Sequence, residues 1–186
     1  MTGGFRALGE REVVRARMAT LAVGTFEAPD GSTFEREIVH HPGWVAAVPL
    51  LEDGRSVLCV RQYRAPIDAL LLEIPAGLCD VDGEPPELTA ARELAEEVGR
   101  RAERFELLAR VHNSAGFCDE TGLVYLATGL SEVPVDLQGV EERNMTTEVV
   151  ALADVPGLVA DGRLTDAKTI IGLLAARERL GVVDQD

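Results

Sequence analysis

The chain has 186 residues, of which 46% are hydrophobic, and its 32 acidic and 18 basic side chains give a formal net charge of −14. This composition excludes a disordered acidic polypeptide, because the apolar fraction is large enough to build a core in one compact domain. It also argues against binding to nucleic acid or to an anionic membrane, because the chain as a whole repels phosphate and has no run of Lys and Arg.

Strands alternate with turns in the first half of the chain. Acidic-Gly turns at residues 28–31 and 52–55 interrupt stretches that are rich in Val, Ile, Leu and Thr, which predicts two hairpins. The strands expected here span residues 20–27, 33–39, 44–51, 56–63 and 70–74.

The second half adds helices to the predicted strands. A Gly- and Pro-rich loop over residues 75–86 leads into a helix that ends near Val98, before Gly99. The later elements are strands at 105–112, 122–128 and 147–152, a short helix after Asp154 and a longer helix over 166–180. This order predicts an α/β or α+β domain. The segment 129–146 shows no obvious element, and loops of this length are often functional.

Three cysteines indicate the compartment. Cys59, Cys79 and Cys118 form no CxxC pair and leave an odd thiol in any disulfide scheme, as expected in a reducing environment. Residues 1–17 lack the apolar stretch of a secretory signal, and no apolar run is long enough to span a membrane. We therefore expect a soluble, cytoplasmic protein.

The helix over residues 86–98 has two different faces. Three carboxylates, Glu93, Glu96 and Glu97, are spaced i,i+3 and i,i+4, so they repel one another on a solvent-facing side. A hard divalent cation such as Mg²⁺ would offset that repulsion. The alternative is a solvated acidic face with a surface ion pair between Arg92 and Glu96, and spacing alone does not decide. The opposite, core-facing side is expected to consist of Leu88, Ala91, Leu94, Ala95 and Val98.

The residues around these carboxylates form a longer motif. Gly77, Glu84 and the run Arg92-Glu93-Leu94-Ala95-Glu96-Glu97-Val98-Gly99 resemble the signature of the Nudix hydrolase family. The resemblance implies a Nudix fold, with a mixed β-sheet sandwiched between helices and an N-terminal antiparallel strand region. It also implies a Mg²⁺ site, with Mn²⁺ as a possible substitute. The implied ligands are Glu93, Glu96, Glu97 and the carbonyl group of Ala76, while Gly77, Glu84 and Arg92 would shape the motif.

Other stretches resemble the ADP-ribose pyrophosphatase branch of this family. They are residues 36–43, 60–77, 116–120 and 161–169. By resemblance, Arg36 and Glu37 would lie at the adenine end, Arg64 would meet the diphosphate and Glu120 would lie near the terminal ribose. Ion pairing is the alternative for both arginines, with Glu37 and Glu73 as available partners. Trp44 could be a core aromatic residue or could narrow the nucleotide pocket.

The implied reaction is Mg²⁺-dependent hydrolysis of ADP-ribose, or of a related nucleoside diphosphate sugar, to AMP and ribose 5-phosphate. The alternatives are a different sugar nucleotide as substrate, or a non-catalytic sensor that binds ADP-ribose. In this branch the general base is usually a glutamate on a mobile loop, and Glu142 or Glu141 occupies that region here. We favour Glu142, although a solvated loop would explain both acids.

The resemblance also suggests a division of the chain. Residues 1–40 would form an N-terminal strand region for dimerisation, and residues 41–186 would form the hydrolase domain. The expected assembly is a homodimer with exchanged N-terminal strands.

Overall fold

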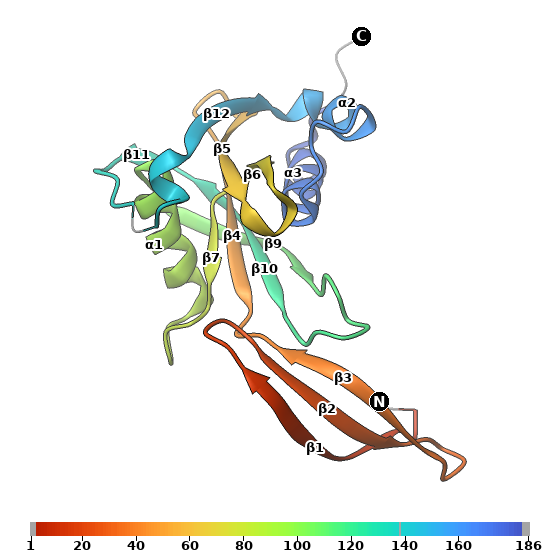
Figure 1. Cartoon of the computed structure of the whole chain (residues 1–186). Helices are drawn as coiled ribbons and strands as arrows, with labels where there is room; N and C mark the ends of the chain where they lie inside the picture. The colour runs from red at the N-terminus through yellow and green to blue at the C-terminus, as the bar shows by residue number, and fades with distance from the viewer. Residues whose placement is uncertain (1–2, 138, 184–186) are drawn as a thin grey trace. The chain divides into compact units, whose positions relative to one another are not determined.

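The computed structural model describes residues 3–137 and 139–183 (Figure 1). Two compact units share the chain: one contains Met1–Gly43 and His112–Thr121, and the other contains Trp44–Val111 and Gly122–Asp186. No helix among the described residues is long and apolar enough to cross a membrane.

The first unit is a three-stranded antiparallel sheet with one attached loop. Its strands, in sheet order, are β1 (Arg6–Arg15), β2 (Thr20–Glu27) and β3 (Thr33–His40). The β2–β3 hairpin confirms the first predicted hairpin. The loop over residues 112–121 joins β3 through the amide of Val39, which donates to the carbonyl of Phe117 at 2.7 Å. The Asp119 carboxylate accepts the backbone N–H of His41 at 2.9 Å and contacts the His40 ring at 2.6 Å.

The second unit contains two larger sheets, one small strand pair and all three α-helices. The mixed sheet has the order β7 (Ala76–Leu78), β4 (Trp44–Pro49), β10 (Gly122–Thr128) and β9 (Arg104–Val111), with β4 and β10 parallel. The other sheet has the order β12 (Thr146–Ala151), β5 (Ser56–Arg64) and β6 (Ala69–Glu73). The remaining elements are the pair β11 (Ser131–Glu132) and β8 (Arg100–Arg101), the helices α1 (Pro86–Val98), α2 (Val155–Ala160) and α3 (Ala167–Leu180), and the 3₁₀ turns η1 (Ala65–Ile67), η2 (Glu142–Asn144) and η3 (Leu152–Asp154).

Helices α1 and α3 pack on opposite faces of strand β4 (Figure 1). Successive side chains of a strand point to opposite faces. Val48 therefore lies in the cluster that contains Leu173 of α3, whereas Ala47 lies in the cluster that contains Leu94 of α1. Trp44 is 7% exposed and belongs to the α3 side, so the core interpretation of this residue is confirmed.

The second predicted hairpin is wrong as a pair of strands. The turn at residues 52–55 forms, and a single bridge joins Leu50 to Val57, but β4 and β5 then enter different sheets. Strand β4 is buried along its whole length and uses its two edges to pair with β7 and β10. No edge of β4 is left for β5.

Candidate active site

Helix α1 presents a buried face that differs from the predicted one. Leu88 is 58% exposed, and the buried residues of the helix are Thr89, Ala90, Leu94, Glu97 and Val98. The helix ends as expected, because Gly99 takes the left-handed conformation at φ 62° that glycine adopts readily. Ala76 and Gly77 approach the C-terminal half of the helix, and Glu97 is buried rather than on a solvent-facing side.

Glu97 is a buried carboxylate without an ion pair. Only 9% of the residue is exposed, and its Oε2 atom accepts the backbone N–H of Ala76 at 3.1 Å. Burial raises the pKa of Glu97 to about 8, and the carboxylates of Glu93 and Glu142 add to the shift. Among residues 3–137 and 139–183, no cation lies within ion-pair distance of Glu97. With this pKa the acid is mostly protonated near neutral pH, and a cation from outside the chain would favour its charged form.

The absence of a side chain at Gly77 leaves room for the Glu93 carboxylate. A Cβ atom on Gly77 would overlap the Glu93 side chain, so any larger residue at position 77 would displace the Glu93 side chain. Burial raises the pKa of Glu93 as well, with Glu96 and Glu142 adding to the shift and Arg92 opposing it. The motif therefore needs glycine at this position because two chain segments approach closely, and not because of a left-handed turn.

Arg92 contacts three acidic side chains of the motif. Its guanidinium group lies 2.7 Å from Glu93, 3.4 Å from Glu96 and 3.5 Å from Glu84. Glu84 also accepts the Thr89 hydroxyl at 2.7 Å. The surface pair between Arg92 and Glu96 is therefore one part of a larger network that connects the loop before α1 to the helix.

The carboxylates of α1 have the chemistry of a divalent-cation site without a preformed ligand cage. Among the described residues, no three His, Cys, Asp or Glu side chains are gathered as a group that could hold a metal ion. Glu93 and Glu142 nevertheless add to the raised pKa of Glu97, and Glu142 adds to that of Glu93, so these groups lie close enough to repel. Oxygen donors of this kind suit Mg²⁺, which needs few carboxylates and completes its shell with water and phosphate. The residues present fit such an ion.

Arg64 is held by a buried acid. Its Nε and Nη2 atoms donate to Glu73 at 2.6 and 2.5 Å, and Glu73 is only 1% exposed. Lys168 also contacts Glu73 and lies 3.0 Å from Asp166. Burial alone would raise the pKa of Glu73, but Arg64 and Lys168 keep it below its usual range. The predicted ion pair between Arg64 and Glu73 is present, and it leaves 40% of the Arg64 side chain exposed.

The adjacent acids Glu141 and Glu142, in the loop before β12, affect different groups. Glu142 adds to the raised pKa of both Glu93 and Glu97, whereas Glu141 adds to that of Tyr63. The Oε2 atom of Glu142 also accepts the N–H of Gly139 at 3.0 Å. Glu142 is therefore the acid of this pair that lies near the carboxylates of α1.

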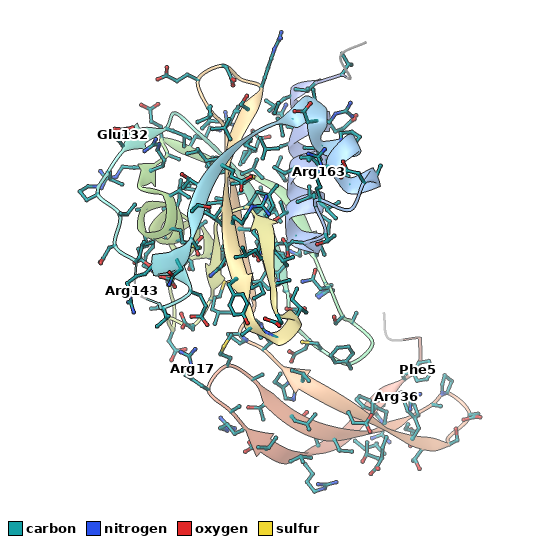
Figure 2. The ribbon with its side chains drawn as sticks, turned by 45° about the horizontal axis from the view of Figure 1, so that its top comes forward. Phe5, Arg17, Arg36, Glu132, Arg143 and Arg163 are labelled. Atoms are coloured by element: carbon teal, nitrogen blue, oxygen red, sulfur yellow. The ribbon has the colours of Figure 1, made fainter. Side chains whose placement is uncertain are left out.

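The remaining predicted residues belong to the first unit. Arg36 lies over the ring of Phe34 at 4.8 Å and donates to the carbonyl of Glu35, and it forms no ion pair with Glu37 among the described residues. Arg36 and Glu37 line a cavity of about 530 Å³ that is walled mainly by aromatic and loop residues of this unit. Figure 2 shows Phe5 and Arg36 on the three-stranded sheet. The carbonyl of Glu120 contacts the ring of His112 at 2.9 Å.

A model of the NUDIX domain matches residues 40–171. This chain belongs to the Nudix family. It is 44% identical to the ADP-ribose pyrophosphatase of Mycobacterium tuberculosis (strain ATCC 25618 / H37Rv) over 147 residues, which cover 79% of this chain and 70% of the relative. It is 35% identical to the ADP-ribose pyrophosphatase of Bacillus subtilis (strain 168), with 88% of each chain covered. A crystal structure of an ADP compounds hydrolase matches with a TM-score of 0.80 at 25% identity, covering 95% of this chain and 94% of the other.

The sequence alone does not indicate a site role for Glu73 and Lys168, which form a charge network with Arg64. The sequence indicates Glu73 only as an ion-pair partner of Arg64, and Lys168 only as part of the segment 161–169. One signal was available for Lys168: it is the single lysine among 18 basic residues.

We predict that Gly77→Ala displaces the Glu93 carboxylate and lowers catalytic turnover at least tenfold, because the added methyl group needs the space that Glu93 fills. The matched control is Gly157→Ala in α2, where a Cβ would meet no atom within 4 Å. Steady-state kinetics on both variants, with circular dichroism to check folding, measure the effect. Equal activity in the two variants would contradict the role of Gly77.

Proposed function

We propose that this protein hydrolyses the diphosphate bond of ADP-ribose to give AMP and ribose 5-phosphate, with Mg²⁺ as the cofactor. The observation that carries the proposal is the buried carboxylate of Glu97, which lies among like charges and has no ion pair within the described chain. The two relatives named ADP-ribose pyrophosphatase support the choice of substrate. A related nucleoside diphosphate sugar is the alternative substrate.

The metal would be held by Glu93, Glu96, Glu97 and the carbonyl group of Ala76, with Mn²⁺ able to replace Mg²⁺. When bound, the ion supplies Lewis-acid polarisation of the diphosphate and lowers the pKa of the attacking water. Arg92 keeps the acids of the motif in place through its contacts with Glu84, Glu93 and Glu96.

Charged side chains would bind the substrate. Arg64 would donate to the diphosphate, since a guanidinium group suits paired phosphate oxygens. Arg36 and Glu37 would contact the adenine end, and the cavity that they line supports this assignment. Glu120 would lie near the terminal ribose.

Glu142 would act as the general base. A base must take a proton from the attacking water as that water reaches phosphorus. Carboxylates that bind a cation are poor bases, because the cation favours their charged form. The electrostatic coupling of Glu142 to Glu93 and Glu97 supports its assignment over Glu141.

The proposed setting is the cytoplasm, and the proposed partner is a small molecule rather than a nucleic acid. Three free cysteines and a net charge of −14 support both points. We further propose that residues 1–40 mediate dimerisation while residues 41–186 carry the hydrolase activity. Strand β1 supports this division, because all ten of its residues are exposed.

Product analysis tests the function directly. The full chain is incubated with Mg²⁺ in ¹⁸O-labelled water and a panel of nucleotide sugars that includes ADP-ribose. Release of AMP and ribose 5-phosphate at the highest kcat/KM of the panel is expected. Faster turnover of another sugar nucleotide would identify that nucleotide as the substrate in place of ADP-ribose. Tight binding of ADP-ribose without turnover would show that the protein is a sensor rather than an enzyme.

We predict that Glu97→Gln lowers turnover by a factor of about 100 or more, because the substitution removes a charged metal ligand. The variant should fold, since a buried neutral amide costs less than a buried charge and can still accept the N–H of Ala76. The stabilisation of the protein by Mg²⁺ should also be lost, which thermal melts with and without the ion measure. Glu87→Gln, an exposed change on the same helix, is the control. Near wild-type turnover at saturating Mg²⁺ would exclude Glu97 as a ligand.

A second prediction separates the two loop acids. Glu142→Gln should lower kcat about 100-fold with metal binding retained, because a general base contributes about 10² to 10⁴ in rate. Glu141→Gln should stay within about threefold of the parent, since Glu141 is not among the groups that raise the pKa of Glu93 or Glu97. Single-turnover kinetics and Mn²⁺ binding provide the two readouts. If the two variants behave alike, the base lies elsewhere.

A third prediction concerns the assembly. Sedimentation equilibrium should give twice the 20.0 kDa of one chain. Replacing Val13 and Val14 of β1, which are 50% and 55% exposed, by glutamate should give monomers, because charge opposes burial of this apolar surface. A monomeric parent protein would overturn the proposed dimer.

A further inference from the structure

The single lysine of the chain lies in a buried network of charges. Seventeen of the 18 basic residues are arginine, and Lys168 is the exception. Its side chain is only 13% exposed, whereas Arg6, Arg15 and Arg163 form their ion pairs at 65 to 71% exposure. A compact ammonium group can share one carboxylate oxygen with an arginine fork, and Lys168 does so at Oε2 of Glu73.

Glu73 receives Arg64 in a defined orientation. The Nε and Nη2 atoms of Arg64 face the acid, and within the described chain Nη1 has no hydrogen-bond acceptor. The inner edge of the guanidinium group is thus used by the protein, and the outer edge is left for a ligand. Arg64 and Glu97 each affect the pKa of the other, which shows that the two side chains lie near each other.

The charges of this network balance only when Lys168 is present. Two acids, Glu73 and Asp166, face two cations, Arg64 and Lys168. Without the lysine, Arg64 would be the sole cation for two partly or fully buried carboxylates, since it already interacts electrostatically with Asp166. The guanidinium group would then be drawn towards the acids, and its remaining charge would be less available to a phosphate.

We infer that Lys168 is a positioning residue that neutralises Glu73 and Asp166 and thereby keeps the outer edge of Arg64 available for the substrate diphosphate. The inference rests on the proposed function of the site. It assigns to helix α3 a part in phosphate binding, although Lys168 itself contacts no substrate in this account.

The same network connects α3 to the segment beside Glu97. Asp166 caps α3 by accepting the N–H of Thr169 at 2.9 Å and its hydroxyl at 2.6 Å. The Thr169 hydroxyl oxygen accepts the N–H of Ile74 at 2.9 Å, and two residues later Ala76 donates to Glu97. Lys168 therefore belongs to a network of contacts that includes both Arg64 and the segment beside Glu97.

A kinetic double-mutant cycle tests the inference. Lys168→Met, Arg64→Ala and the double variant are compared with the parent at a temperature well below unfolding, and Arg163→Met serves as the control. Figure 2 shows Arg163 on the segment before α3, and its ion pair with Asp161 is 69% exposed on the arginine side. Lys168→Met should lower kcat/KM for ADP-ribose at least tenfold, mainly through KM, while the control stays within twofold.

The decisive comparison is made in the Arg64→Ala background. There Lys168→Met should cause at most a further twofold loss, because the residue acts through Arg64. Losses that multiply would show that Lys168 acts independently of Arg64. A lower melting temperature with unchanged kcat/KM would show a purely structural role. Either result overturns the inference.

A binding measurement separates this inference from the proposed reaction. Protein labelled with ¹³C-lysine gives one lysine side-chain signal, so Lys168 can be followed by NMR without activity. Inorganic pyrophosphate with Mg²⁺ should shift the signal in the parent protein and not in Arg64→Ala. Absence of a shift in the parent would refute the inference. A shift in a protein that fails to hydrolyse ADP-ribose would refute the proposed reaction alone.

Discussion

The cost of burying a carboxylate governs the arrangement of this site. Glu73 and Glu97 are both buried, at 1% and 9% exposure, and water no longer compensates their charge. Arg64 and Lys168 compensate Glu73, so its pKa falls below its usual range. Glu97 has a backbone N–H and like charges around it, and its pKa rises to about 8. Side chains of the protein thus compensate the charge of Glu73, whereas the proposed divalent ion would compensate that of Glu97.

The segment that follows Glu73, residues 74–77, contacts both α1 and α3. Ile74 donates to Thr169 of α3, and Ala76 donates to Glu97 of α1, so the two helices are joined through a few residues of backbone. Gly77 then lets Glu93 approach the same backbone. A substitution in this segment would therefore disturb its contacts with α1 and α3 together.

Local patterns in the sequence predicted most of the fold. Turn residues and apolar strands located β2, β3, β5, β6, β9, β10 and β12, and Gly99 correctly ended α1. Pairing was harder to predict, because the burial of β4 on both faces depends on partners distant in sequence. The burial of Glu97 is not predictable from the helix alone for the same reason: a helical projection describes one helix, whereas Glu97 contacts the backbone of Ala76 in another segment.

The sequence predicted which residue types form the candidate site, but not which of those residues contact one another. Motif spacing identified the acids of α1, yet it could not show that Arg92 meets three of them or that Gly77 makes room for Glu93. Adjacent Glu141 and Glu142 look equivalent in a sequence, and only folding shows that they face different groups. Lys168 becomes informative once its two acidic partners are known.

Anomalous diffraction from crystals grown with Mn²⁺ would show where a divalent ion binds. We expect a manganese peak bounded by the carboxylates of Glu93 and Glu97, at the end of α1. Manganese bound away from these carboxylates in a protein that hydrolyses its substrate would exclude Glu93 and Glu97 as the metal ligands.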